Sequence, residues 1–84
     1  MNERLIKDVD ELSALYTADR SARISIVDKI NELLPRIQAA ILAASDFAEV
    51  QSAQRALRIC LRLRARVAGD ASREFGRYIS PTEL

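Results

Sequence analysis

The stretch SDFAE (residues 45–49) decides the fold of this 84-residue chain, because it separates two long segments with helical patterns. Asp46 is followed three residues later by Glu49, the spacing of a capping box, in which two side chains satisfy the first N–H groups of a helix. The spacing predicts that one helix ends near residue 44 and another begins at Asp46. A connection this short makes the flanking helices run antiparallel, as a helical hairpin.

The segment before this turn, residues 21–44, has the apolar spacing of an amphipathic helix. Its apolar seam consists of Val27, Ile30, Leu34, Ile37, Ile41 and Ala44. The seam keeps its phase through Pro35, which favours one helix with a kink, since proline lacks an N–H donor and crowds the carbonyl of Asn31. The alternative is a helix that ends at Leu34 and a second helix with Pro35 at its first position.

A shorter amphipathic helix is expected over residues 3–17. Its apolar residues fall on one face: Leu5, Val9, Leu12 and Tyr16. The polar stretch TADRSAR (residues 17–23) interrupts the pattern and predicts a turn, with Thr17, Asp19 or Ser21 as the cap of the next helix. One continuous helix through this stretch is the alternative.

The last helix is expected over residues 46–79, with a frayed tail at residues 80–84 because Pro81 ends a helix. An unbroken helix of this length spans roughly 50 Å at 1.5 Å per residue. Either Gly69 breaks it, or its end projects beyond the rest of the fold and needs a second chain to cover it.

The fold class that follows is all-α: an antiparallel helical hairpin or three-helix bundle of long amphipathic helices, in a single domain of residues 1–84. A core of this size leaves only about 3–5 kcal/mol of net stability without a staple such as a disulfide or a metal. One cysteine and no histidine supply neither. That leaves self-association, which we expect as a homodimer, or stabilisation by a partner protein.

The composition also limits the kind of function. The sequence contains no glycine-rich phosphate loop and no catalytic or metal-binding motif, and its carboxylates are expected on exposed helix faces. We expect no enzyme, no cofactor and no metal, and Cys60 is expected to be a buried, inert thiol. No apolar run approaches the about 20 residues that span a bilayer, and the N-terminus lacks a secretory pattern, so we expect a cytoplasmic protein without membrane association.

The stretch RALRICLRLRARVAG (residues 55–69) holds five arginines and no acid. On a helical wheel, four of them form a ridge with two apolar residues beside it. These six are the candidate partner-binding residues: Arg55, Arg58, Ile59, Arg62, Leu63 and Arg66. The ridge is either a solvated face neutralised by acids of the first helix, a docking site for an acidic protein surface, or a site for a phosphate backbone.

Arg64 is the fifth arginine, and the wheel places it in the middle of the apolar face. An unpaired charge buried there would be costly. A buried Arg64 would need a carboxylate from Asp8, Asp28 or Glu32, or it would fix the register of a dimer as buried polar groups do in coiled coils. The alternative is a side chain that runs along the surface and carries its charge to water.

These features favour a small non-enzymatic protein-binding module, that is, an adaptor, a chaperone-like protein or a stoichiometric inhibitor that occludes a partner with an acidic surface. The arginine ridge would provide steering and carboxylate pairing. The alternative is a nucleic-acid-binding regulatory protein that uses the same ridge. A net charge of only +1 and the absence of interleaved aromatic residues argue against that alternative.

Overall fold

The computed structural model describes residues 2–84, so Met1 of the expected domain lies outside the described residues. Three α-helices and two short 3-10 helices make up this part of the chain, which contains no strand. They are α1 (Glu3–Ala18), η1 (Arg20–Ala22), α2 (Arg23–Ala43), α3 (Phe47–Phe75) and η2 (Pro81–Glu83). The all-α fold class is confirmed.

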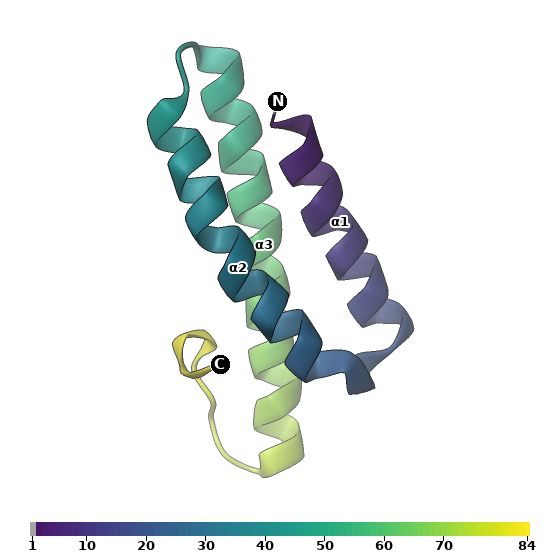
Figure 1. The fold of residues 1–84 in the computed structure, drawn as a ribbon. Helices are drawn as coiled ribbons and strands as arrows, with labels where there is room; N and C mark the ends of the chain where they lie inside the picture. Colours follow the sequence, from purple (N-terminus) through teal and green to yellow (C-terminus); the bar gives the residue numbers. More distant parts are fainter. Residues whose placement is uncertain (1) are drawn as a thin grey trace.

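The three helices lie side by side, and each packs against the other two (Figure 1). The contact between α2 and α3 is the most extensive, and the chain reverses direction between them (Figure 1). The core residues are Leu5, Val9, Leu12, Tyr16, Ile26, Ile30, Leu33, Ile37, Ala56, Cys60, Leu63 and Val67. All three helices therefore contribute one apolar face to a common core.

The turn between α2 and α3 is held by the hydrogen bonds that its sequence predicts. The N–H of Glu49 donates to Asp46 Oδ1 at 2.8 Å, and Asp46 has the extended backbone of an N-cap. The Glu49 carboxylate accepts from the N–H of Ser45 at 3.1 Å, one residue before the cap. The capping box is thus confirmed, with its return bond shifted by one residue.

The chain also turns between α1 and α2, at the polar stretch that interrupts the apolar pattern. Asp19 has an extended backbone, and its side chain accepts from the N–H of Ser21 at 3.0 Å, which caps η1. Beyond this turn α2 is one helix that includes Pro35, so the alternative of two helices divided at the proline is wrong. Pro35 is exposed, and its neighbours Leu33 and Ile37 are buried in the core on the other side of the helix.

Helix α3 continues without a break through Gly69 and ends at Phe75, four residues earlier than expected. A glycine inside a helix costs only about 1 kcal/mol, and here Val67, Ala68 and Ala71 pack in the interior on both sides of it. The helix ends instead at Gly76, whose φ of 70° is a left-handed conformation that favours glycine.

The residues after α3 are not a frayed tail. They turn back at Gly76 and pack beside the helices (Figure 1). Ile79 is only 8% exposed, its N–H donates to Ser72 Oγ at 2.7 Å, and Leu84 packs against the core. The expected tail of residues 80–84 overlooked the apolar Leu84, and Ile79 was expected at the end of the last helix. Both residues give the segment a reason to return to the fold.

Candidate functional site: the arginines of α3

The arginine ridge, defined as Arg55, Arg58, Arg62 and Arg66, lies on the exposed face of α3. Within residues 2–84, no carboxylate oxygen lies within 4.0 Å of Arg55, Arg58 or Arg62. The acids of α1 therefore do not neutralise these three side chains. Their guanidinium groups keep their hydrogen-bonding capacity for water or for a binding partner.

Arg66 differs from the other three because α1 holds it. Its Nη2 donates to Thr17 Oγ1 at 3.2 Å, and its guanidinium lies over the ring of Tyr16, 5.5 Å from the ring centroid. This is the geometry of a cation–π contact. The ridge thus has one arginine with a fixed position and three without an intramolecular partner.

The two apolar residues expected beside the ridge occupy different environments. Leu63 is 1% exposed and belongs to the core, so its expected role as a surface anchor is wrong. The physical reason is that α1 covers this flank of α3, where Thr17 and Tyr16 meet Arg66. Ile59 is half-buried and packs partly against the core, which leaves it the more accessible of the two.

Arg64 is half-buried, and its Nε is buried without a hydrogen-bond partner among the described residues. It forms no ion pair with Asp8, Asp28 or Glu32 in residues 2–84, so the expected intramolecular carboxylate is wrong. Nε is its only nitrogen that is both buried and unpartnered, which favours a side chain whose stem is covered and whose end reaches water. Its role in the register of a dimer stays a prediction.

Cys60 is fully buried, as expected for a thiol on the apolar side of this helix. Burial raises the pKa of the Cys60 thiol, and the nearby charge of Arg64 lowers it by less. A raised pKa reduces the thiolate fraction, which is the nucleophilic form. Among residues 2–84 there is also no cluster of three side chains that could hold a metal ion.

A polar cluster that the sequence analysis did not predict lies at the far end of the ridge. The hydroxyl of Tyr16 donates to Asp70 Oδ2, Arg73 pairs with the other carboxylate oxygen, and Arg20 Nη1 lies 3.6 Å from Oδ2. These contacts join α1, η1 and α3 around one carboxylate that is 17% exposed. The sequence signals only the pair of Asp70 and Arg73, which are three residues apart on one helix.

The protonation states within this cluster follow from its contacts. The hydrogen bond from Tyr16 and the charges of Arg20 and Arg73 hold the pKa of Asp70 below its ordinary value. Burial, followed by the hydrogen bond to Asp70, raises the pKa of Tyr16 to about 12. At neutral pH the pair is therefore a neutral phenol that donates to an ionised carboxylate.

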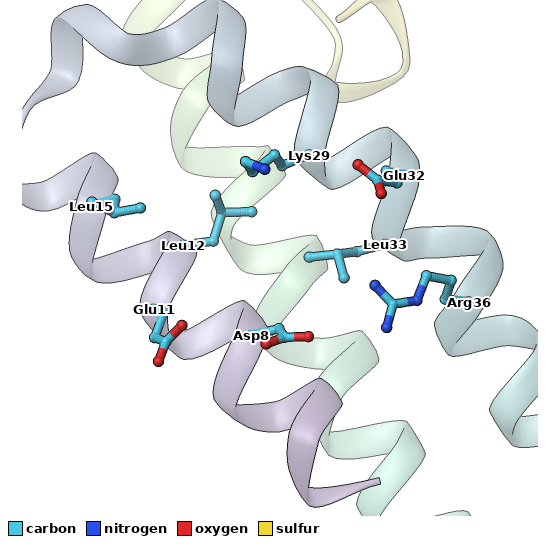
Figure 2. A pocket seen from close by; sticks show the side chains of 8 residues that line it. All are labelled: Asp8, Glu11, Leu12, Leu15, Lys29, Glu32, Leu33 and Arg36. Atoms are coloured by element: carbon cyan, nitrogen blue, oxygen red, sulfur yellow. The ribbon is translucent and has the colours of Figure 1, made fainter. Parts of the chain in front are cut away.

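A second charged surface lies between α1 and α2, in a groove of about 290 Å³. Figure 2 shows Leu12 and Leu33 on facing sides of this groove, with charged side chains around them. The charged residues have both signs: Asp8, Glu11, Lys29, Glu32 and Arg36. Its mixed charge contrasts with α3, where the exposed ridge is purely cationic.

Within residues 2–84, no helix combines the length and the apolar character that are needed to cross a membrane. Comparisons of the chain with models of protein families, with curated proteins and with solved structures found no match.

Proposed function

We propose that this protein is a non-enzymatic protein-binding module that docks an acidic surface of a partner protein on the arginine ridge. The observation that carries the proposal is the exposed row of Arg55, Arg58 and Arg62, which have no carboxylate partner within residues 2–84. An arginine fork binds a carboxylate through two parallel hydrogen bonds. Such a row offers several forks on one rigid support.

The proposed action is stoichiometric. By occupying an acidic surface the module would act as an adaptor, a chaperone-like protein or an inhibitor that occludes its partner. Charge complementarity of this kind mainly increases the association rate and the specificity, while apolar contacts add affinity. Ile59, half-buried beside the ridge, is the apolar residue suited to that part.

A homodimer in the cytoplasm is part of the same proposal. A lone thiol suits a reducing compartment. Support for self-association comes from the small core and from large apolar side chains that remain exposed, namely Ile24, Phe75 and Tyr78 at one end and Leu42 and Phe47 near the α2–α3 turn. Sedimentation equilibrium over a range of concentrations measures the number of chains directly, and a single monomeric species would contradict the dimer.

The docking proposal is tested by capture with the tagged protein from native lysate, with and without nuclease. The ridge variant is Arg58→Glu/Arg62→Glu. A matched control, Arg4→Glu/Lys7→Glu, makes the same change of charge on the exposed face of α1. The captured protein is then purified and titrated with each variant at two salt concentrations.

We expect a protein that is retained after nuclease, lost with the ridge variant and kept with the control. Saturable binding in the titration identifies it as a direct partner. Loss of all captured material after nuclease would instead support the nucleic-acid alternative, as would affinity that falls steeply with salt. Retention of the same partner by the ridge variant would overturn the proposal.

A further inference from the structure

A groove of about 580 Å³ lies beside the ridge, at the end of α3 where the polar cluster is found. We call it the arginine groove, and it is lined by Arg20, Arg62, Ala65, Arg66, Gly69, Asp70 and Arg73. Helix α3 supplies all of these residues except Arg20, which η1 carries. Along α3, residues 62, 66, 70 and 73 are four, four and three positions apart, so they fall in one stripe.

The charges around the arginine groove do not balance. Four guanidinium groups and one carboxylate line it, which leaves a net charge of +3. Asp70 is already engaged by Tyr16, Arg20 and Arg73, and its side chain is only 17% exposed. Its carboxylate therefore pairs with Arg20 and Arg73 and offsets only one of the four positive charges.

Two of the four arginines, Arg66 and Arg73, are held in place before any ligand binds. Arg66 is fixed by Thr17 and by the ring of Tyr16, and Arg73 is fixed by Asp70. A guanidinium has five N–H donors, and these contacts use only a few of them. Binding at such a site costs less side-chain entropy than binding to flexible arginines.

The floor of the arginine groove is open to a small group. It is formed by Ala65 and Gly69, the smallest residues of this stripe. A Cβ atom added at Gly69 would meet nothing within 4 Å. An anion can therefore approach the helix between the surrounding guanidinium groups.

From this geometry we propose that the arginine groove binds a dianionic phosphate-type group. A single carboxylate would leave a charge of +2, whereas a phosphate monoester carries about −1.5 to −2 at pH 7 and offers three acceptor oxygens to several guanidiniums. The inference goes beyond the docking of an acidic protein. The two sites share Arg62 and Arg66, but Arg20 and Arg73 belong to the arginine groove alone and are not changed in the test of the ridge.

The residues that line the groove include one carboxylate, Asp70, and no histidine. The charged and titratable groups that face the site are Arg20, Arg62, Arg66, Asp70, Arg73 and Tyr16. Asp70 has a lowered pKa, Tyr16 has a pKa of about 12, and the sequence has no histidine. We therefore expect any change of affinity between pH 5 and pH 7.5 to come from the ligand.

The test follows the backbone amides of Gly69 and Asp70 by ¹⁵N NMR at constant ionic strength. The probes are inorganic phosphate, a short neutral peptide with one phosphoserine, the same peptide with serine, and acetate. We expect saturable shifts with the two phosphates and none with acetate or the serine peptide. Tighter binding of the phosphopeptide than of inorganic phosphate would assign the group to a protein, and equal binding would assign it to the free anion.

A second titration compares binding at pH 5.0 and pH 7.5. The second ionisation of a phosphate monoester lies at about pH 6, so the phosphopeptide is mostly a monoanion at pH 5.0 and should bind about tenfold more weakly there than at pH 7.5. Sulfate stays dianionic over this range, so it should bind with equal affinity at both pH values. Shifts that do not saturate, or equal shifts with acetate, would overturn the proposal.

Two variants locate the site. Arg20→Gln/Arg73→Gln should weaken phosphate binding about tenfold, while the ridge control Arg55→Gln/Arg58→Gln should not change it. Gly69→Leu keeps every charge and fills the floor, so it should weaken binding even if the double variant is unstable. Equal weakening by the ridge control would mean general attraction to positive charge and would refute the site, whatever the capture experiment gives.

Discussion

The two halves of α3 use the same residue type in opposite ways. In the first half, Arg55, Arg58 and Arg62 have no carboxylate partner within residues 2–84. In the second half and the segment after it, Asp70, Glu74 and Glu83 each pair with one or more arginines. Charged side chains of the second half therefore connect α3 with α1 and α2, while the three arginines of the first half make no such contact among the described residues.

The largest effect should come from the buried side of the same helix. Leu63→Ala removes a side chain that is 1% exposed, so we expect a loss of about 2–5 kcal/mol in the free energy of unfolding, measured by urea denaturation. Leu61→Ala is the matched control, since Leu61 is 38% exposed and should cost much less. Equal losses would mean that α1 does not cover the flank of α3 that carries Leu63.

Tyr16→Phe breaks the link between α1 and the second half of α3. Burial raises the pKa of Tyr16 to about 12, so the folded state holds the phenolic proton more tightly than the unfolded state. This stabilisation is complete below pH 10 and is lost as the pH rises towards 12, by about 2–3 kcal/mol. Denaturation at pH 9 and pH 11.5 should show this loss in the parent chain and not in the variant.

Asp70→Asn should cost about 1–2 kcal/mol at neutral pH, because it removes the charge that Arg20 and Arg73 surround. The pKa of Asp70 is held below its ordinary value, so its contribution is complete above about pH 4 and is lost as the pH falls through the lowered pKa. Acid denaturation should therefore be shallower in the variant. A parallel acid profile in both chains would contradict the pairing.

Gly69 lies at the boundary between the two halves of α3, and Gly69→Ala tests the helix there. Because a Cβ there meets nothing within 4 Å and the residue is helical, we expect a gain of about 0.5–1 kcal/mol in the free energy of unfolding. Thermal denaturation shows whether the variant is more or less stable than the parent chain. A loss would indicate that α3 bends at this residue in solution.

The smallest effect is expected for the first half of the helix. Arg55→Gln/Arg58→Gln should change the free energy of unfolding by less than about 0.5 kcal/mol, since these side chains have no intramolecular partner to lose. Urea denaturation measures this change in the free energy of unfolding. A clear loss would mean that the ridge supports the fold and is not reserved for a partner.

Local signals in the sequence predicted the local structure. The capping box at Asp46 and Glu49, the turn after Thr17 and the apolar face of α1 depend on residues within one or two helical turns, and the sequence displays these directly. The continuity of α3 through Gly69 could not be decided in this way. It depends on packing against other helices, which outweighs the small cost of one glycine.

The candidate site was only partly predictable for the same reason. A helical wheel finds the exposed row of Arg55, Arg58 and Arg62, because exposure follows from one helix alone. It does not show which flank a second helix covers, and so it placed Leu63 beside the exposed ridge and Arg64 in the middle of the apolar face. The cluster around Asp70 needs Tyr16 and Arg20 from distant parts of the chain, a relation that spacing does not contain.

The unbroken course of α3 also sets the spacing at which the proposed partner would meet the arginines of the ridge. On a continuous helix, Arg55, Arg58 and Arg62 stand at fixed intervals of about 4.5 and 6 Å along the axis. If a folded acidic partner docks on the ridge as proposed, carboxylates at similar intervals would suit these arginines best, as on a helix with acids three and four residues apart. A disordered acidic segment could adjust the spacing of its own carboxylates to that of the arginines. Under the proposed function, the spacing of the arginines would therefore add to the selectivity that their charge provides.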